Sequence, residues 1–567
     1  MLDVIGRSQR GRVCEFKRGE SVIRTPAVLS SYDGPSEDSM YIRRTDGRRY
    51  LEIMGSKIEL DPKLLISASS RIPSEPVCSE GACVLRLPIT GDEIIPDDVE
   101  VVVVPNAYEL RKDPRNTVAS VIALRKMAGY NRLLCMFGIA EPSTIALLTY
   151  MGVDIFDDSL SKAAGIRGIS LIPEGEIFKG GDVSEGNCTQ ISGEIDKIIT
   201  FTMAERLREL VDQRAPASPS SVATLRIFDD VGYEYQEEAC SVTGCRFSCN
   251  TAQSLCRPDI KRYKEKITET YRKPDHKRVL LLLPCSAKKP YHISKTHKAF
   301  ASAIHTAQHD TLVHEVIVTS PLGIVPRELD AMYPANSYDI PVTGQWKCEE
   351  KKMIRDMVSN LISQGYDNVV CHLGDDYELV EGLAEMECTV VGDPTSPASL
   401  RNLDETLRRI TKGMEPVDYY VDRREAMKSI VTQQFGKDVA DVFMDENTYA
   451  IGKFPYWKIM HENPDDRKVK IQVGMLTPER GMISLTGEGA EIFADNGFFT
   501  VEMMDFEMKG NLFAVGVIKA DPRIRVGDEA VITLNGKVKG VGVAMMSGNE
   551  MTDLKRGIAV KVRHKVK

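Results

Sequence analysis

The sequence predicts a multidomain α/β protein that ends in a small β-rich domain. Its 567 residues exceed what one hydrophobic core supports, so about three to five domains are expected. Short apolar runs alternate with helical segments over most of the chain, which is the rhythm of α/β folds. After residue 494 the chain turns rich in glycine and in strand-forming residues.

Composition excludes several classes of protein. Hydrophobic residues make up 42% of the chain and charged residues 27%, as in ordinary soluble domains. The longest apolar runs, such as 279–283, are far shorter than the roughly 20 residues that cross a bilayer. The first 20 residues lack the apolar core of a secretory signal, and the 13 cysteines are scattered. We therefore expect a cytoplasmic protein with reduced thiols and no membrane partner.

The first predicted domain spans residues 1–257. Its best-defined elements are strands and helices that alternate along the chain, namely 100–105 (strand), 115–127 (helix), 133–137 (strand), 142–151 (helix) and 153–157 (strand). The last of these strands delivers carboxylates at its C-terminal end. In a barrel of parallel strands, that end is where chemistry is done.

A second α/β domain, Rossmann-like in its alternation, is predicted for residues 275–414. Pro274 and Asp275 end a charged helix just before a buried strand, which places a boundary near 271–277. The expected elements are strands at 278–283, 313–319 and 368–372 and helices at 349–364 and 400–411. A small α+β spacer domain is expected over 415–494, and a β-barrel over 495–567.

Reactive side chains are concentrated at the start of this second domain. Six of the nine histidines lie between His276 and His314, and they surround the segment 284–297. The segment follows a buried strand, where open α/β sheets place ligands. Cys285 has lysines and histidines nearby, which favour a thiolate nucleophile. The alternative is a small buried cysteine at a strand end beside a solvated lysine loop.

The segment 284–297 contains a spaced set of residues, namely Pro284, Cys285, Lys289, Pro290, Tyr291, Ser294 and His297. Together these residues resemble the signature of archaeosine synthase, a paralogue of archaeal tRNA-guanine transglycosylase. The likeness continues through 319–328 and 333–346, and it includes the flanking domains. It implies catalytic roles for Cys285, Lys289, Tyr291, Ser294 and His297, and substrate contacts at Arg327 and Glu328.

The resemblance also implies the reaction. In that family, the ε-amine of free lysine adds to the nitrile of 7-cyano-7-deazaguanine in the D-loop (position 15) of tRNA, giving an amidine. A separate radical SAM partner then releases archaeosine. Our hypothesis is that Cys285 forms a thioimidate and that His297 or Tyr291 moves protons. Lys289 or Ser294 would orient the base or the substrate lysine.

The N-terminal domain resembles the TIM-barrel-like catalytic domain of transglycosylases around residues 137–142 and 152–158. In those enzymes an aspartate at this strand end is the glycosyl nucleophile, and Asp157 lies at the matching place. The family's base-binding segment has no counterpart among residues 100–115. Base exchange is therefore not expected, and Asp157 is interpreted as structural or as a residual substrate contact.

A structural zinc ion is predicted after this domain, within 240–276. Transglycosylases carry three cysteines and a histidine here, and four cysteines within 17 residues precede a histidine in this chain. The candidate ligands, enough for tetrahedral zinc, are Cys240, Cys245, Cys249, Cys256 and His276. Their spacings differ from the usual Cys-x-x-Cys pattern, and the alternative is a packed turn with free thiols.

From residue 499 the chain contains Asp505 and Phe506, followed by the segments 514–517, 525–529 and 556–563. This pattern resembles a PUA domain, a small β-barrel that binds RNA. Residues 521–567 hold ten Lys and Arg against five Asp and Glu, a local charge of +5 in a chain of net charge -9. Alternating basic residues on a strand would share one face and meet phosphates, unless they line a solvated edge. The predicted RNA contacts are Lys555, Arg556, Lys561, Arg563 and Lys565, with Lys567 beyond them.

Two other functions remain open. The first is an ordinary base-exchanging tRNA-guanine transglycosylase, and the second is a non-catalytic scaffold that presents tRNA to the radical SAM partner. A homodimer also remains open, since the sequence does not determine the oligomeric state.

Overall fold

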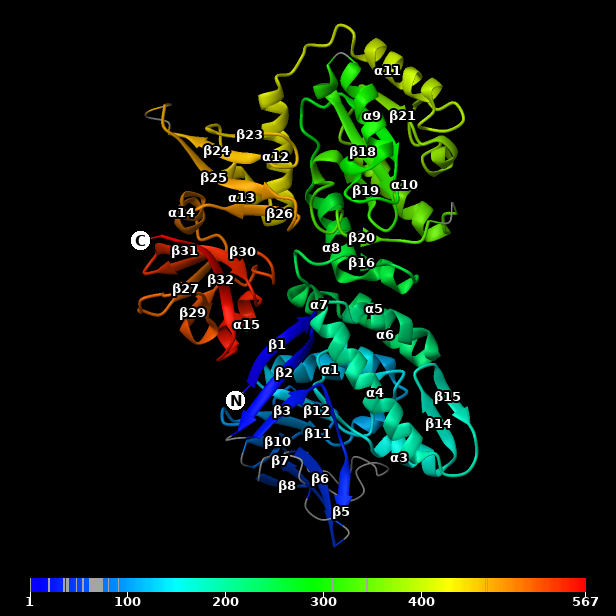
Figure 1. The fold of residues 1–567 in the computed structure, drawn as a ribbon, viewed down its shortest axis with the longest axis vertical. Coiled ribbons are helices and arrows are strands. Elements are labelled where there is room, and N and C mark those ends of the chain that lie inside the picture. The colour runs from blue at the N-terminus through cyan, green and yellow to red at the C-terminus, as the bar shows by residue number, and fades with distance from the viewer. Residues whose placement is uncertain are drawn as a thin grey trace. The chain divides into compact units, whose positions relative to one another are not determined.

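The computed structural model describes most of the chain, which divides into two compact units (Figure 1). The described residues are 2–18, 21–33, 36, 40–46, 48–53, 56–60, 75–79, 81–89, 91–307, 309–342, 345–463, 466 and 468–566. The first unit comprises Met1–Cys240, Asn511–Arg525 and Met546–Ala559. The second comprises Ser241–Gly510, Val526–Met545 and Val560–Lys567.

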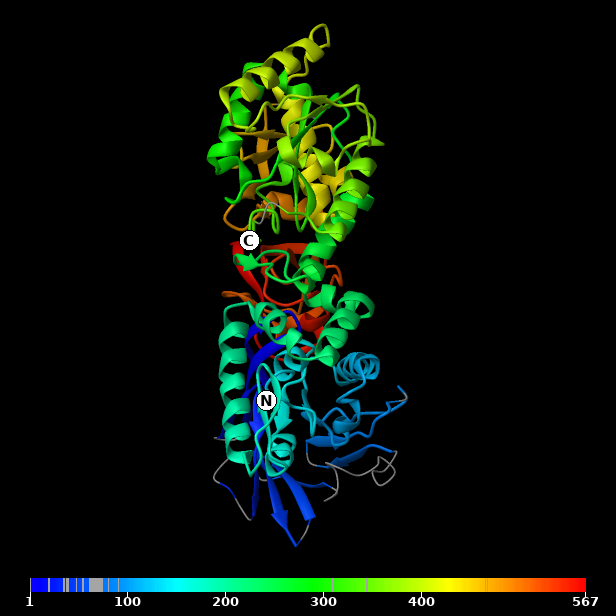
Figure 2. The same cartoon turned by 90° about the vertical axis from the view of Figure 1, so that its right-hand side faces the viewer.

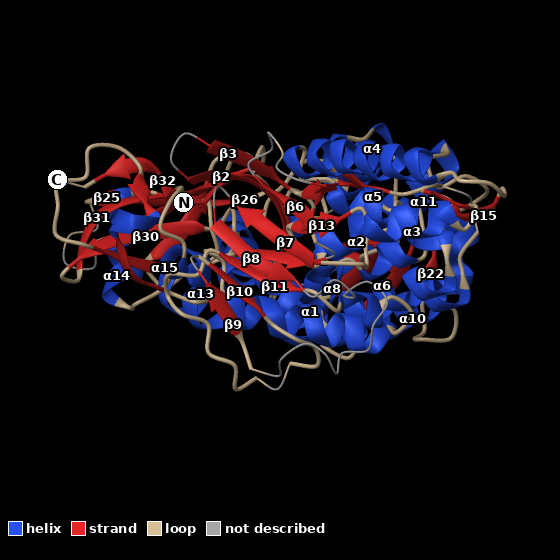
Figure 3. Ribbon diagram, turned by 90° about the horizontal axis from the view of Figure 1, so that it is seen from below, coloured by secondary structure: helices blue, strands red, loops and turns tan. Residues whose placement is uncertain are grey.

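Helices and strands alternate in both units, which makes this a mixed α/β multidomain protein (Figure 3). The strands predicted at 100–105, 133–137, 313–319 and 368–372 are all present. No helix among the described residues is both long enough and apolar enough to span a membrane.

A six-stranded sheet forms the centre of the first unit. Its order is β4 (Ala27–Leu29), β13 (Ile155–Asp157), β12 (Leu133–Met136), β11 (Val101–Val104), β10 (Ala82–Val84) and β9 (Val77–Ser79). All neighbours pair in parallel except β9, which is antiparallel to β10. The described strands run from one edge to the other without closing, so the expected TIM-type barrel is not confirmed.

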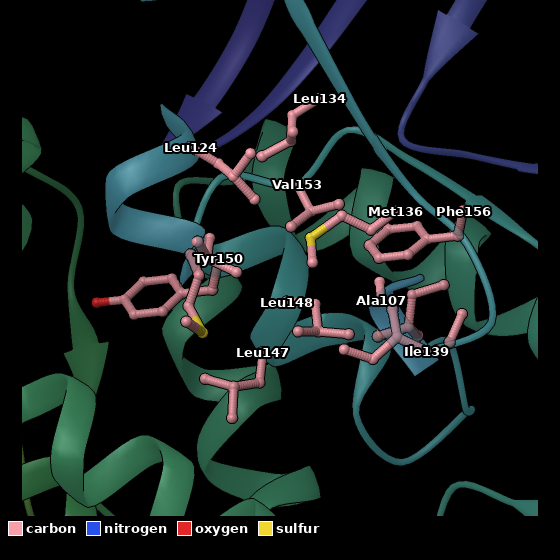
Figure 4. Close-up of a cluster of buried hydrophobic side chains, with 14 of the residues drawn as sticks. Ala107, Leu124, Leu134, Met136, Ile139, Leu147, Leu148, Tyr150, Val153 and Phe156 are labelled. Atoms are coloured by element: carbon pink, nitrogen blue, oxygen red, sulfur yellow. The ribbon is translucent and has the colours of Figure 1, made fainter. Parts of the chain in front are cut away.

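Both faces of this sheet are covered. Val102 and Val104 of β11 belong to one buried cluster, whereas Val101 and Val103 belong to a second cluster on the other face. Side chains alternate between the faces of a strand, so a strand covered on both sides must be apolar throughout. Figure 4 shows part of the first cluster, where Leu134 and Met136 lie close to Val153 and Phe156.

Smaller sheets and helices complete the first unit. The smaller sheets are β1 (Leu2–Ser8), β2 (Gly11–Arg18) and β3 (Ser21–Thr25); β5 (Ser31–Asp33), β6 (Met40–Thr45), β7 (Arg48–Ile53) and β8 (Ser56–Leu60); and β14 (Ile169–Ile172) with β15 (Gly175–Phe178). The helices are α1 (Pro114–Ala128), α2 (Ile145–Tyr150), α3 (Ser159–Ile166), α4 (Ser184–Met203), α5 (Leu207–Arg214), α6 (Pro219–Val231) and α7 (Tyr233–Ala239). Helix α4 packs against β1 and β2 (Figure 2).

One pair of cysteines departs from the expectation of reduced thiols. Cys78 on β9 and Cys83 on β10 are joined by a disulfide. The two strands pair antiparallel with Cys78 directly opposite Cys83, which brings the sulfurs together. This cross-strand register could not be read from a separation of five residues in the sequence.

The second unit contains a five-stranded sheet that carries the signature segment. Its order is β19 (Gly323–Pro326), β18 (Val313–Thr319), β17 (Val279–Pro284), β21 (Asn368–Cys371) and β22 (Glu387–Cys388). The strands pair in parallel except β19, which is antiparallel to β18. Side chains of α9 (Lys295–Thr306) and α11 (Pro397–Thr411) pack on one face, and α10 (Cys348–Ile362) packs against β19. The sheet is mostly parallel, and the finer Rossmann assignment is not confirmed.

A short parallel pair lies beside the signature in the second unit. It consists of β16 (Phe247–Ser248) and β20 (Tyr338–Asp339). Helix α8 (Pro258–Glu265) follows β16 and continues into a π-helical turn at Lys266–Thr270.

The segment from 415 to 494 combines helices with an antiparallel sheet, as expected of an α+β region. Its elements are α12 (Tyr419–Phe435), α13 (Lys437–Phe443), β23 (Thr448–Ile451), β24 (Lys458–Glu462), β25 (Lys470–Thr477), β26 (Met482–Leu485) and α14 (Gly487–Asp495).

The C-terminal strands form a six-stranded sheet. Its order is β28 (Leu512–Phe513), β32 (Ile558–Lys565), β31 (Lys537–Ala544), β30 (Glu529–Leu534), β27 (Thr500–Met503) and β29 (Val517–Ala520). A short helix, α15 (Gly548–Asp553), precedes β32. The β-rich end predicted from the sequence is therefore present.

Candidate active site around Cys285

The signature residues lie on one strand–loop–helix unit. Strand β17 ends at Pro284, and Cys285 follows at once, at the C-terminal edge of the parallel strands β18, β17 and β21. The loop continues through Lys289 to a short turn at Tyr291–Ile293, and Ser294 then begins α9. Thirteen residues of sequence thus bring all five predicted catalytic residues to one sheet edge, where α/β folds place ligands.

Cys285 is only partly exposed, and burial raises the pKa of its thiol. Lys289 and Thr319 act in the opposite direction, whereas Asp376 raises the thiol pKa further. The shift as a whole is upward, so the resting sulfur is a thiol. This corrects the expectation that neighbouring cations hold a thiolate, because desolvation outweighs them here.

Lys289 follows Cys285 in the same loop, and its positive charge acts on the Cys285 thiol. Its ammonium lies 4.3 Å from the centre of the Tyr338 ring and 5.9 Å from that of Tyr291. Burial lowers the pKa of Lys289, with Cys285 and Asp339 opposing the shift. The thiol pKa rises and the amine pKa falls, so moving a proton from sulfur to this amine costs more than it would in water, and the neutral pair is favoured at rest.

Tyr291 and Ser294 are both held inside the protein. The Tyr291 hydroxyl donates to Thr319 Oγ1 at 3.0 Å and also bonds the hydroxyl of Tyr338. Ser294 is the N-cap of α9, and its hydroxyl accepts from the His297 backbone N–H at 3.1 Å. A side-chain oxygen at this position satisfies one of the unpaired N–H groups of the first helical turn.

His297 faces an arginine and is nearly completely buried. Its Nδ1 accepts a hydrogen bond from Arg327 Nη2 at 2.9 Å, and the side chain is 1% exposed. Burial and Arg327 lower the pKa of His297 to about 3. The ring is neutral, and since Nδ1 accepts a bond, its proton is assigned to Nε2. Such a histidine is a weak base and is placed to hold the loop against α9.

The two predicted substrate contacts lie in different networks. Arg327 also donates to Glu315 Oε2 at 2.9 Å and to Asp330 Oδ2 at 3.1 Å. Glu328 is buried and accepts from the Tyr271 hydroxyl at 2.5 Å, in a network that continues to His314. Of the pair, only Arg327 touches a signature residue, and the substrate role of both stays a prediction.

Asp157 lies at the end of β13 in the first unit and is 1% exposed. Its Oδ1 accepts from the Gly138 N–H at 2.6 Å, and its Oδ2 accepts from the Ser159 hydroxyl. Both oxygens are engaged by the protein, which agrees with the structural interpretation of this residue.

The predicted zinc ligands differ in burial and in their partners. Cys240 and Cys249 are buried, whereas Cys245 and Cys256 are exposed. His276 Nε2 instead contacts Asp422 Oδ1 of α12 at 2.8 Å. Among the described residues, no group of three or more His, Cys, Asp or Glu side chains is arranged to hold a metal ion. The zinc ion stays a prediction, and no step of the chemistry is assigned to one.

The predicted RNA contacts differ in how available they are. Lys555, Arg556, Lys561 and Lys565 are exposed, although Lys565 donates to the Lys509 carbonyl at 2.5 Å. Arg563 is exposed as well, but it pairs with Glu529, whose side chain is fully buried, and donates to the Leu485 carbonyl at 2.7 Å. Lys567 lies outside the described residues.

A bulge on β32 overturns the prediction of one basic face. Val541 pairs with His564 but Gly542 pairs with Val562, so Arg563 is an extra residue on this strand. An inserted residue breaks the alternation of side chains. Lys561 and Lys565 therefore do not follow one uninterrupted face, and Arg563 serves the interior ion pair.

Three residues of the site were missed by sequence reasoning, namely Thr319, Tyr338 and Asp376. Thr319 and Asp376 act on the Cys285 thiol, and Tyr338 packs against Lys289. Thr319 and Tyr338 fall inside the two stretches that extend the family likeness, which was the available signal. Asp376 lies in the turn Gly374–Leu379, and the sequence contained no signal that would have identified it.

The first unit contains a cavity of about 460 Å³ at the carboxyl ends of β11 and β12. Arg111 and Glu141 form an ion pair in its wall, and hydroxyls of Ser143 and Ser218 line it. Burial raises the pKa of Glu141 despite the guanidinium beside it. The cavity mixes both charges with apolar walls, so its lining does not specify one class of ligand.

Comparison with known proteins places these features in a family. One family model, described as a domain of unknown function (DUF5591), matches residues 260–407, and the PUA domain model matches residues 501–566. The archaeosine synthase subunit alpha of Thermoplasma acidophilum is 34% identical over 83% of this chain and 89% of its own length. That of Methanosarcina acetivorans is 32% identical over 82% and 79%. A tRNA-guanine(15) transglycosylase of Methanobrevibacter smithii is 24% identical over 64% and 51%.

The chain is thus a PUA-containing relative of the tRNA-modifying transglycosylases, with its signature loop on a separate α/β sheet. Within that class, it belongs to the archaeosine synthase subunit alpha family.

Proposed function

We propose that this protein modifies tRNA by adding free lysine to 7-cyano-7-deazaguanine at position 15 of the D-loop. The ε-amine of lysine and the nitrile form an amidine, and a radical SAM partner enzyme then releases archaeosine. Membership of the archaeosine synthase family supports tRNA as the substrate, and so does the PUA match at residues 501–566. The lysine step follows from the signature and from the chemistry that its residues can perform.

The main observation in support of the proposal is the position of the Cys285 sulfur. Cys285 is partly exposed at the C-terminal end of a buried strand, with Lys289 and Thr319 acting on its thiol. A nitrile carbon is a weak electrophile, so it needs a strong nucleophile and a proton for its nitrogen. A thiol whose proton can move to a neighbouring amine supplies both.

The reaction needs no oxidant, and no group leaves the modified nucleobase. Lys289 takes the thiol proton, the sulfur attacks the nitrile carbon, and the nitrile nitrogen receives that proton, giving a thioimidate. The ε-amine of lysine then attacks the same carbon, and the carbon–sulfur bond breaks. The departing sulfur takes up the proton that the amine loses. The net change is the addition of one N–H of lysine across the carbon–nitrogen triple bond.

The remaining signature residues would position this pair. Ser294 fixes the first turn of α9, and His297 is neutral and bonded to Arg327. A histidine with a pKa of about 3 is not a base at neutral pH, so the proton transfer falls to Lys289. The exposed Lys555, Arg556, Lys561 and Lys565 would contact tRNA phosphates.

The test is to incubate the protein with lysine and tRNA that carries the cyano base, and to weigh the digested nucleosides by mass spectrometry. We expect a lysine adduct from the unaltered protein and none from Cys285→Ala. The matched control is Cys348→Ala, which alters an exposed cysteine at the start of α10. Full adduct formation by Cys285→Ala would rule out covalent catalysis.

The same incubation separates the alternative functions. Incorporation of labelled free base into tRNA would indicate a transglycosylase. Unchanged nucleosides in the absence of the radical SAM partner would indicate a scaffold.

A further inference from the structure

The amine of Lys289 lies over the ring of a buried tyrosine. Its ammonium is 4.3 Å from the centre of the Tyr338 ring, whereas the ring of Tyr291 is farther away, at 5.9 Å. Tyr338 belongs to β20, and its side chain is fully buried. The face of an aromatic ring carries negative potential, so it attracts a cation that lies over it within about 6 Å.

The protein holds the Tyr338 ring at its backbone and at its hydroxyl. Strand β20 pairs with β16, and Tyr338 lies opposite Phe247. The Thr319 hydroxyl donates to the Ser320 carbonyl at 3.1 Å, and its oxygen lies 2.6 Å from the Tyr338 hydroxyl. The Tyr291 hydroxyl also bonds that of Tyr338. The orientation of the ring is therefore set by these neighbours and does not depend on the charge of Lys289.

We propose that the ring of Tyr338 positions the Lys289 amine and stabilises its ammonium form, which makes Tyr338 a positioning residue for the proton transfer. The consequence for catalysis rests on the proposed function, in which Lys289 takes the thiol proton. That transfer turns a neutral amine into an ammonium ion, and a ring face attracts the ion much more strongly than the amine. The ring thereby offsets part of the cost that burial places on this step.

The charged and titratable groups around Lys289 act in both directions. Burial lowers the pKa of Lys289, and Arg246 lowers it as well. Cys285, Asp339 and Cys249 raise it without reversing the fall. Asp339 also pairs with Arg246 at 2.8 Å, so the effects of these two charges on the amine oppose each other. The ring of Tyr338 differs from all of these groups, because its attraction for the ammonium does not depend on the ionisation of a partner.

A tyrosine that served only to fill the interior would behave differently. Its buried ring and its hydrogen bonds contribute to stability, and their loss would destabilise the protein. Neither contribution depends on whether the amine of Lys289 is charged. The protonation of Lys289 is therefore the property to measure, and the adjacent Lys288, which is exposed, serves as an internal reference.

The experiment is the pH dependence of acetylation at Lys289 in the full-length protein without tRNA. The protein is labelled briefly with acetic anhydride, and the remaining amines are labelled with the isotopically heavy reagent after denaturation. Fragment masses of one peptide then report Lys288 and Lys289 separately. Only the neutral amine is a nucleophile, so the midpoint of each profile reports the pKa of that amine.

The variants separate the ring of Tyr338 from its hydroxyl. In Tyr338→Leu we expect the Lys289 midpoint to fall by about one pH unit, the effect of losing one desolvated cation–π contact. Tyr338→Phe keeps the ring, so its midpoint should stay close to that of the unaltered protein. Replacing Tyr338 with trifluorophenylalanine keeps a ring but removes the negative potential of its face, so the midpoint should fall again. The Lys288 midpoint should be the same in all four proteins.

Tyr366→Leu is the matched control, because the ring of Tyr366 lies 5.2 Å from the ammonium of another lysine of the second unit, Lys273. It should leave the Lys289 midpoint unchanged. A trifluorophenylalanine midpoint equal to that of Tyr338→Phe would overturn the proposal, whether or not Tyr338→Leu folds. A shift in Tyr338→Phe as large as that in Tyr338→Leu would overturn it too, since the hydroxyl and not the ring would then be responsible.

The acetylation profile does not depend on the proposed reaction. If the unaltered protein forms no lysine adduct while the Lys289 midpoint still falls without the ring, the proposed function fails and the role of the Tyr338 ring stands. If the adduct forms but the midpoint does not fall, only the positioning proposal fails.

Discussion

At the scale of single residues, burial acts oppositely on the acid and the base of the signature loop. Burial raises the pKa of the Cys285 thiol and lowers that of the Lys289 amine, since each loses the water that stabilises its charged form. The neutral pair is thereby favoured at rest. The types of these residues were evident in the sequence, but their protonation depended on a burial that the sequence does not give.

His297 provides a test of this environment through the pH dependence of stability. Its pKa is about 3 in the folded protein against 6.5 ordinarily, so between these values the unfolded chain holds more protons. The stabilising effect is present above pH 6.5 and is lost as pH falls toward 3. Between pH 6.5 and 4.5 we expect His297 to account for about 2 kcal/mol of lost stability.

The measurement is denaturant unfolding followed by tryptophan fluorescence. Trp346 and Trp457 are the only tryptophans, and both lie in the second unit, which also contains His297. His297→Gln should unfold with a weaker dependence on pH over this window, whereas His305→Gln, on the exposed side of α9, should match the unaltered protein. Equal pH dependence in all three proteins would contradict the burial of a neutral imidazole.

At the scale of elements, the strand–loop–helix unit from β17 to α9 determines the site. The apolar run 279–283 predicted a buried strand, and the structure has it as β17. The sequence also showed Ser294 among the signature residues, but it did not show that this serine caps a helix. The capping role depends on where α9 begins, which single residues do not reveal.

Replacing Ser294 with alanine tests the capping role. The change should cost about 1 kcal/mol of stability, because the His297 N–H loses its acceptor. Formation of the lysine adduct should slow modestly, since the first turn of α9 carries His297. Ser396→Ala is the matched control, because Ser396 caps α11 by accepting from the Ser399 N–H.

The two serine variants should lose similar stability, and only Ser294→Ala should alter adduct formation. Complete loss of the adduct by a fully stable Ser294→Ala protein would assign the hydroxyl to the chemistry itself.

At the scale of the whole molecule, charge is unevenly distributed along the chain. The net charge is -9, yet residues 521–567 carry +5. An RNA-binding function needs a local positive field, which neutralises phosphates and releases counterions. The exposed Lys561 and Lys565 of β32 are available for this, whereas Arg563 is engaged by Glu529.

A double variant measures the contribution of these lysines. Lys561→Gln with Lys565→Gln should weaken tRNA binding and reduce the slope of log affinity against log salt by about one to two units. The matched control removes two exposed lysines of the first unit, Lys126→Gln with Lys179→Gln, and should leave the slope unchanged. Salt-titrated tRNA binding is the measurement, and equal slopes in both variants would place the RNA contact elsewhere.

The sequence by itself determined the α/β class, the positions of the main strands and helices, the C-terminal PUA domain and the family. These depend on local periodicity and on motifs, which are properties of neighbouring residues. Only the tertiary structure decided that Thr319 and Tyr338 act electrostatically with Cys285, and that Arg563 lies at a bulge and pairs with the buried Glu529. These outcomes depend on burial and on pairing between distant segments, which determine protonation, hydrogen-bond partners and exposure.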